Sequence, residues 1–292
     1  MPRLLTPKLL RALARMRLQS PAPVYGTHKG EHKSRLRGSS VEFSDYREYE
    51  PGDDFRHIDW NIYHRLDRLF VRLFTEEQSR SLDILVDTSE SMSVGNPSKV
   101  DYARRVGAAL AYAALWGGDH ARLGGAGAAL SWKTPSWRGR HRAPAFFSAL
   151  GNLSAAGLTD LTAALRQLAK ARQAPGNITV LISDLFDPRW EEALSALAAV
   201  RGSPVLIHLL DVDDWRPGFS GEIEVVDSET GERLELAVDA AVLSAFHRKA
   251  AEWAQSVRER CLRLSIDCYQ LDTTFDIEDF VLKTLREGGL LR

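Results

Sequence analysis

The apolar residues of this chain follow one dominant pattern after residue 82. Short apolar runs alternate there with longer segments whose apolar positions recur at helical spacing. Such alternation predicts an α/β fold, with a mostly parallel, Rossmann-like sheet and helices on both faces. The expected strands are 82–86, 121–130, 178–183, 205–210 and 264–271, and the expected helices are 99–116, 160–172, 188–200, 239–262 and 277–287.

Two smaller patterns depart from this rhythm. Residues 25–80 hold single apolar positions and two strand-like runs, which predicts a small β-rich segment. Residues 221–238 hold two alternating runs around a polar turn, which predicts an inserted β-hairpin. We therefore expect an N-terminal amphipathic helix within 1–24, the β-rich segment 25–80, and an α/β domain spanning 81–292.

The N-terminal 24 residues are basic and carry leucines at helical spacing. Leu5, Leu9 and Leu13 recur on one face, and the segment contains no acidic residue. A membrane-surface helix or a targeting peptide would have this composition. A short helix that packs its leucine face on the domain explains it as well, and we favour that interpretation because such stripes are common in protein cores.

The composition excludes several classes of function. Lys plus Arg is 38 and Asp plus Glu is 39, so the net charge of −1 provides no overall basic field for nucleic acid. Two cysteines, Cys261 and Cys268, are too few for a disulfide framework or a cysteine-type zinc site. No apolar run approaches the roughly 20 residues of a transmembrane helix, so we expect a cytoplasmic protein.

Polar side chains follow three of the expected strands or loops. Asp87, Ser89 and Ser91 come directly after the first buried strand, and Asp184 follows the run 178–183. Thr159 opens an expected helix. Ligands of parallel α/β sheets bind at the carboxyl ends of the strands, and hard cations such as Mg²⁺ take oxygen ligands. Asp, Ser and Thr are also common turn and cap residues, but three such loops together favour a metal site.

This set resembles the metal-ion-dependent adhesion site of von Willebrand factor A domains. That site combines Asp-x-Ser-x-Ser with a Thr from a second loop and an Asp from a third. The resemblance implies that Ser89, Ser91 and Thr159 lie at the metal, that Asp87 and Asp184 act largely through water, and that a partner's carboxylate completes the coordination. The implied ion is Mg²⁺, with Mn²⁺ or Ca²⁺ as alternatives.

The segment before the first strand is similar to a second, longer signature. Residues 43–60 read Phe-Ser-Asp-Tyr-Arg-Glu-Tyr-Glu-Pro-Gly-Asp-Asp-Phe-Arg-His-Ile-Asp-Trp. This stretch resembles that of the domain-of-unknown-function family 58, in which it precedes an A-type domain. Two positions depart from the pattern, since Arg65 matches only loosely and Leu158 replaces a Gly. The resemblance implies a companion of MoxR-type AAA+ ATPases that acts as an adaptor or co-chaperone in complex assembly.

The charged residues of this signature have two interpretations. Arg47, Asp53, Asp54, Arg56 and Asp59 alternate in sign over a short span. A salt-bridged, hydrogen-bonded turn that pins the N-terminal strands to the sheet would use them in Arg–carboxylate pairs. A partner surface or a catalytic carboxylate cluster is the other interpretation. We favour the structural role, because charge clusters serve it more often.

Three functional hypotheses follow. The preferred one is a non-enzymatic, metal-dependent protein-interaction module whose partner presents an acidic residue. The alternative is an Mg²⁺-dependent phosphohydrolase with Asp87 as nucleophile, but the general acid expected two residues later is replaced by Ser89. A third hypothesis is nucleic-acid binding by the basic, Trp-containing loop 132–144. We expect neither catalytic residues nor a nucleic-acid partner.

Overall fold

The computed structural model describes residues 4–19, 41–76, 80–157, 159–171, 176–226 and 231–292. The chain divides into two compact units. The larger unit comprises Met1–Val24 and Arg80–Arg292, and the smaller comprises Tyr25–Ser79. The N-terminal segment therefore belongs with the α/β unit, although it is separated from it in sequence.

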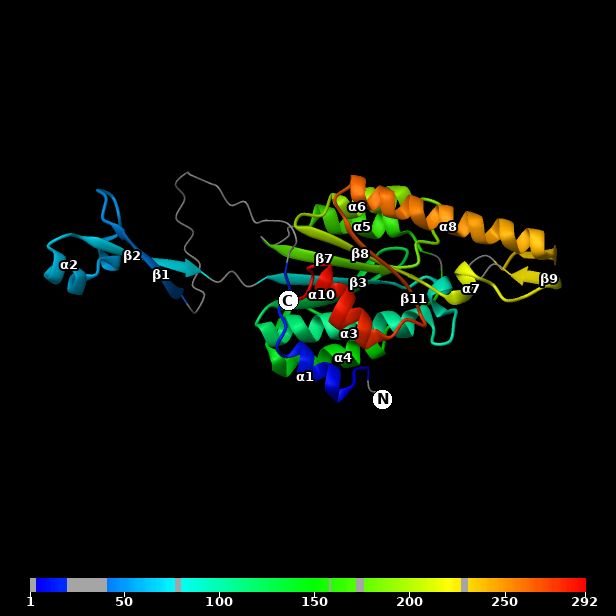
Figure 1. Ribbon diagram of the computed structural model, residues 1–292, viewed down its shortest axis with the longest axis horizontal. Helices are drawn as coiled ribbons and strands as arrows, with labels where there is room; N and C mark the ends of the chain where they lie inside the picture. Colours follow the sequence, from blue (N-terminus) through cyan, green and yellow to red (C-terminus); the bar gives the residue numbers. More distant parts are fainter. Residues whose placement is uncertain (1–3, 20–40, 77–79, 158, 172–175, 227–230) are drawn as a thin grey trace. The chain divides into compact units, whose positions relative to one another are not determined.

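A seven-stranded sheet forms the centre of the larger unit (Figure 1). Its strand order is β11-β8-β7-β3-β4-β5, and β6 pairs with β4 outside this order. Five strands are parallel, whereas β5 and β6 run antiparallel to β4. The strands are β3 (Ser81–Asp87), β4 (His120–Ala126), β5 (Leu130–Trp132), β6 (Trp137–Arg138), β7 (Asn177–Ser183), β8 (Ser203–Leu210) and β11 (Asp267–Asp272).

Side chains of the central strands alternate between two apolar cores. In β3, Leu82, Ile84 and Val86 face one core, and Leu85 faces the other. All seven residues of β7 are buried. Strands covered on both faces need apolar residues at successive positions, which is why the sequence shows continuous apolar runs here.

Helices cover both faces of this sheet (Figure 1). On one face lie α1 (Pro7–Leu13), α3 (Lys99–Gly117), α4 (Ala143–Gly151) and the C-terminal helices α9 (Ile277–Asp279) and α10 (Leu285–Glu287), joined by a π-helical turn. On the other face lie α5 (Leu161–Lys170), α6 (Trp190–Ala198) and α8 (Ala240–Arg263). The mixed α/β class with a mostly parallel sheet is therefore as predicted.

Helix α1 is docked on the domain by its leucines. Leu5, Leu9 and Leu13 are buried in the same core as α3, and Thr6 caps the helix by accepting a hydrogen bond from the Leu9 amide. Lys8 forms an ion pair with Glu278, with 2.7 Å between Nζ and Oε2. The leucine spacing thus marks a core face, as the favoured interpretation of this segment predicts.

Three secondary-structure predictions were wrong in detail. The expected strand 121–130 ends at Ala126, because the chain turns back there to form antiparallel β5. The expected loop 132–144 contains β6 and leads directly into α4, a helix that the sequence reading missed. The expected strand 264–271 begins only at Asp267, because the backbone of residues 264–266 is bonded to the end of α8.

A hairpin and a short helix interrupt the α/β rhythm after β8. The hairpin consists of β9 (Gly221–Val226) and β10 (Arg233–Val238), paired antiparallel with each other. Before it lies the one-turn helix α7 (Val212–Trp215), closed by a capping box between Asp211 and Asp214. The hairpin insertion was predicted, and α7 was not.

The smaller unit pairs two antiparallel strands and adds one helix. These elements are β1 (Val41–Glu48), β2 (Phe70–Glu76) and α2 (Trp60–Leu66). Asp59 is the N-cap of α2 and accepts hydrogen bonds from the amides of Asn61 and Ile62. Both strands were expected from the sequence, and α2 was not.

Candidate functional site

The first candidate loop begins at the buried end of β3. Both carboxylate oxygens of Asp87 accept hydrogen bonds, Oδ1 from the Ser89 amide at 2.9 Å and Oδ2 from the Ser183 hydroxyl at 2.5 Å. The hydroxyl oxygens of Ser89 and Ser91 lie 2.9 Å apart. All three predicted residues of this loop are buried. The loop therefore brings one carboxylate and two hydroxyls together away from bulk water.

The carboxylate of Asp87 lies in an unfavourable environment for a negative charge. Burial, together with repulsion from Asp184, raises the pKa of Asp87 to about 7, although hydrogen bonds from Ser183 and Ser89 partly oppose the shift. Desolvation and a like charge both disfavour ionisation. A bound cation would reverse this, because it would compensate the charge that water no longer solvates.

Asp184 is paired with a residue that the sequence reading did not single out. Lys99, the first residue of α3, places Nζ 2.7 Å from Asp184 Oδ2 and 2.9 Å from Asp214 Oδ2. The side chains of Lys99 and Asp184 are each only 1% exposed. The ammonium also lies 4.6 Å from the centre of the Phe186 ring. Lys99 is thus an internal counter-charge for the third predicted loop.

The charges around Lys99 have opposing effects on one another. Burial lowers the pKa of Lys99, but the carboxylates of Asp184 and Asp214 outweigh it, so that the net pKa is raised. Burial raises the pKa of Asp214 in spite of the nearby ammonium. Lys99 is therefore held in its charged form, and the pair of carboxylates is only partly compensated by one cation.

His208 fixes the backbone of the Asp184 loop. Its Nε2 lies 3.1 Å from the Asp184 carbonyl oxygen, and its Nδ1 lies 3.0 Å from the Gln270 side-chain nitrogen. Because the Gln270 amide is a donor, Nδ1 accepts and Nε2 donates, as in neutral imidazole. Burial lowers the pKa of His208 to about 4. A neutral, buried histidine on β8 therefore positions the loop that carries Asp184.

Thr159 lies on the second loop, beside the end of β4. Its hydroxyl is 3.5 Å from the Ala126 carbonyl oxygen, and that carbonyl also accepts the Thr88 amide at 2.9 Å. The Glu90 amide donates to the Gly157 carbonyl at 3.1 Å. These bonds connect the loop of Ser89 and Ser91 with the loop of Thr159. Leu158, where the family pattern has Gly, lies outside the described residues.

The donors of the first loop are of the right kind for a hard cation. Neighbouring oxygens of an octahedral Mg²⁺ site, with ligands at about 2.0–2.1 Å, are roughly 2.9 Å apart. The hydroxyls of Ser89 and Ser91, which share a hydrogen bond, have this separation. Asp184 Oδ2 is buried and accepts no hydrogen bond from a described residue, so its contact with Lys99 is ionic. Asp87, Ser89 and Ser91 thus fit such an ion, whereas Asp184 already has a counter-charge.

Carboxylates and imidazoles alone do not form a metal site here. Among the residues that the structure describes, no group of three or more His, Cys, Asp and Glu is arranged to hold a metal ion. Any ion at this edge of the sheet would therefore depend on serine and threonine oxygens. This agrees with the hydroxyl-rich set that the sequence indicates.

The sequence reading missed three residues that contact the predicted set. Ser183 donates to Asp87, and Lys99 and Asp214 form the ion pairs described above. Ser183 precedes Asp184 at the end of an apolar run, so its position could have signalled it. Lys99 and Asp214 are brought to Asp184 by the tertiary fold, so the spacing of residues in the sequence does not predict these contacts.

The charged signature segment of the smaller unit is used in local structure. Arg47 forms an ion pair with Asp53 at 2.8 Å, and Arg56 forms one with Asp54 at 2.7 Å. The Asp53 carboxylate also accepts the Glu50 amide. These contacts fix a turn within the smaller unit.

Each Trp ring of the basic segment 132–142 has an arginine of the chain itself near one of its faces. The guanidinium of Arg122 lies 3.8 Å from the Trp132 ring centre, and that of Arg142 lies 5.9 Å from the Trp137 ring centre. Stacking on bases requires open aromatic faces. The geometry therefore gives no support to nucleic-acid binding by this segment.

Sequence comparison establishes the family. The chain matches the family described as "Protein of unknown function DUF58" over residues 45–256 and belongs to it. It is 30% identical over 254 residues to an uncharacterised protein of Mycobacterium bovis, covering 84% of this chain and 78% of that protein. An uncharacterised protein of Mycobacterium avium is 31% identical over 135 residues, covering 45% of this chain and 79% of the relative.

Solved structures with a similar fold are distant. The conserved hypothetical protein BatB from Bacteroides thetaiotaomicron has a TM-score of 0.44 and 11% identity, covering 72% of this chain and 98% of that protein. A von Willebrand factor type A protein from Catenulispora acidiphila has a TM-score of 0.41 and 13% identity, covering 75% of this chain and 44% of that protein. These likenesses are too remote to bear on function. In the described part of the chain, no helix is both long and apolar enough to cross a membrane.

Proposed function

We propose that this DUF58 family member is a non-enzymatic protein-interaction module that binds its partner through a divalent metal ion. Asp87, Ser89, Ser91, Thr159 and Asp184 would form the metal site, with Mg²⁺ as the ion and Mn²⁺ or Ca²⁺ as alternatives. The observation that carries the proposal is the buried arrangement of the Asp87 carboxylate and the two hydroxyls 2.9 Å apart. When bound, the ion would supply a positive charge for an acidic residue of the partner.

The charges of the site favour the binding of a carboxylate. Asp87 contributes one negative charge and the serines contribute none, while Lys99 partly compensates the charges of Asp184 and Asp214. A divalent ion held there would keep part of its charge, so that an anionic partner group is attracted. Burial of the loop strengthens this attraction, because little water remains to screen it.

The partner in this proposal is a MoxR-type AAA+ ATPase or one of its clients. The similarity of the signature segment to its family supports this assignment, and the adaptor or co-chaperone role would be exercised in the cytoplasm during complex assembly. The partner must present an exposed Asp or Glu side chain, because that group would complete the metal coordination.

Capture of the ATPase with and without metal tests the proposal. The immobilised wild-type protein should retain a MoxR-type ATPase in Mg²⁺ and release it in EDTA, and Asp87→Asn should fail to capture it. Asp213→Asn is the matched control, because Asp213 is an exposed carboxylate on the nearby helix α7. Equal capture by wild type and a folded Asp87→Asn variant, or capture that EDTA leaves unchanged, would contradict the proposal.

The alternative function, phosphate-ester hydrolysis with Asp87 as nucleophile, has less geometric support. Both oxygens of Asp87 accept hydrogen bonds, and the position of the general acid is occupied by Ser89, whose hydroxyl contacts Ser91. Turnover of p-nitrophenyl phosphate that requires Mg²⁺ and disappears in Asp87→Asn would favour this alternative over the binding module.

A further inference from the structure

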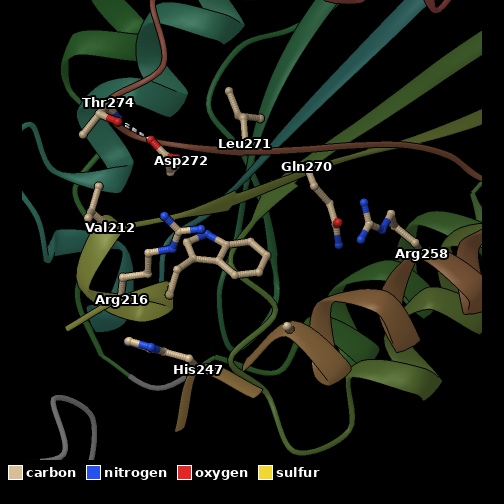
Figure 2. A pocket seen from close by; sticks show the side chains of 10 residues that line it. Val212, Arg216, His247, Arg258, Gln270, Leu271, Asp272 and Thr274 are labelled. Carbon is tan, nitrogen blue, oxygen red and sulfur yellow. Dashed lines mark hydrogen bonds between the residues drawn. The ribbon is translucent and has the colours of Figure 1, made fainter. Parts of the chain in front are cut away.

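A groove of about 900 Å³ lies between α7, α8 and the C-terminal end of β11. Figure 2 shows Val212 and Arg216 on one side, His247 and Arg258 on α8, and β11 passing above them. Three consecutive residues of the strand, 270–272, line the groove. Since successive strand residues point to opposite faces of a sheet, a cavity lined by all three runs along the edge of the strand.

The edge of β11 that faces away from β8 has free backbone groups. Strand β11 is at the end of the strand order and, among the described strands, pairs in parallel with β8 only. Alternate N–H and C=O groups of such a strand point away from its neighbour. Within the described part of the chain, the outward groups of Cys268 and Gln270 have no hydrogen-bond partner, whereas the Asp272 carbonyl accepts the Phe275 amide at 3.1 Å. The groove thus contains the edge of a sheet that is open to one more strand.

The side chains around this edge are mainly basic. Arg216 and Arg258 are exposed, and neither forms an ion pair or hydrogen bond within the described part of the chain. The imidazole of His247 also lines the groove. The carboxylate of Asp272 also lines the groove, but it accepts hydrogen bonds from the amide and hydroxyl of Thr274. Two unpaired guanidinium groups therefore flank the open strand edge.

We propose that this groove binds an extended acidic segment of a partner protein, which adds as a strand to the edge of β11 and places its carboxylates against Arg216 and Arg258. Backbone hydrogen bonds would supply affinity, and the two arginines would select acidic side chains. Trp215 also lines the groove and offers an apolar surface for the alternate side chains of the bound strand. The site does not include the metal loop, so binding to it can be measured in the absence of metal.

The chain itself is a poorer occupant on charge grounds. Residues 20–40, which lie outside the described residues, contain four Lys or Arg and one Glu, so their charge matches that of the groove. The hairpin of another copy is more acidic, since Glu222, Glu224 and Glu235 are exposed on it. Binding of a second copy is therefore the competing outcome that an experiment must distinguish.

A fluorescent peptide of about ten alternating Glu and Val residues is a suitable probe, because a strand of that length spans β11 at about 3.3 Å per residue. Anisotropy should show binding to the full chain in EDTA, and no binding of the peptide in which Lys replaces Glu. The double variant Arg216→Glu/Arg258→Glu should bind the acidic peptide at least about tenfold more weakly, because two attractive contacts become repulsive. Arg248→Glu/Arg263→Glu, with the same change in net charge at exposed positions of α8, should bind like wild type.

N-methylation of alternate peptide amides tests the strand pairing separately, because it removes backbone donors and keeps the charges. Two peptides are compared, one methylated at the odd-numbered amides and one at the even-numbered amides. Only the peptide whose methylated amides would face β11 should lose binding. The inference is overturned if wild type does not bind the acidic peptide, if both double variants weaken binding equally, or if N-methylation has no effect. A second copy would be the occupant if light scattering shows a wild-type dimer that Arg216→Glu/Arg258→Glu dissociates. That result, together with no binding of the acidic peptide to wild type, also overturns the inference.

Discussion

Replacing Lys99 with Met should destabilise the protein strongly in the absence of metal. The substitution keeps the length and volume of the side chain and removes the ammonium that lies 2.7 Å from Asp184 and 2.9 Å from Asp214. Asp184 is as deeply buried as Lys99, and Asp214 is 17% exposed. Breaking a buried ion pair by removing one partner costs about 3–5 kcal/mol, because a charge remains without compensation.

Urea unfolding in EDTA and in Mg²⁺ would measure this effect. We expect Lys99→Met to lose about 3–5 kcal/mol of unfolding free energy in EDTA. The loss should be smaller in Mg²⁺, because a divalent ion near Asp184 restores the missing counter-charge and so binds the variant more tightly than it binds wild type. Lys249→Met on the exposed surface of α8 is the control and should change stability by less than about 0.5 kcal/mol.

Two results would refute this reasoning. A loss below about 1 kcal/mol in EDTA would mean that the buried pair is not a major determinant of stability. A double-mutant cycle with Asp214→Asn provides the second check, because residues in contact show interaction energies of about 0.5–3 kcal/mol. Additive effects of Lys99→Met and Asp214→Asn would show that the ion pair does not couple them.

Three further predictions concern pH and the backbone. The pKa of Asp87 is raised to about 7, and a carboxylate must be deprotonated to bind metal, so the affinity for Mg²⁺ should fall about tenfold per pH unit below pH 7. Calorimetry at several pH values would measure this, and an affinity that does not change with pH would contradict the proposed metal site. Burial holds the pKa of His208 at about 4, below the unfolded value of about 6.5, so its contribution to stability is complete above about pH 6.5 and is lost towards pH 4. Wild type should therefore lose about 3 kcal/mol relative to His208→Gln over this range, in urea unfolding with EDTA, and parallel profiles would exclude this effect. Gly202→Ala should lower the free energy of unfolding by about 2 kcal/mol or more, because φ at Gly202 is +114° and a Cβ there would lie 2.0 Å from the Asn177 carbonyl oxygen. Gly151→Ala is the control: a Cβ there meets open space, so the urea midpoint should stay nearly unchanged.

The sheet could be predicted because its chemistry is local. A strand buried on both faces needs consecutive apolar residues, and residues 82–86 and 178–183 show this directly. Helix α4 was missed because the arginines before it resemble a loop, although Pro144 in its first turn is compatible with a helix start. The polar ends of β3 and β7 could be predicted for the same reason as the strands, since each follows an uninterrupted apolar run.

The counter-charge of Asp184 could not be predicted, because it depends on tertiary packing. Lys99 begins a helix that the sequence indicates, and the first residue of a helix is usually solvent-exposed. Here the helix packs on the sheet so that the side chain is buried between the loops after β7 and β8. Lysine is rarely buried unless it is paired, and neither carboxylate is near it in sequence.

Helix α7 carries a residue that contacts the candidate metal site and residues that line the basic groove, all within one turn. Asp214 of α7 binds Lys99, and Arg216, at the C-terminal end of the helix, lines the groove together with Trp215. The helix has only four residues, and its capping box uses the same Asp214 carboxylate that receives Lys99. A displacement of this turn would therefore alter the Lys99 ion pair and the lining of the groove together, because no flexible segment separates them.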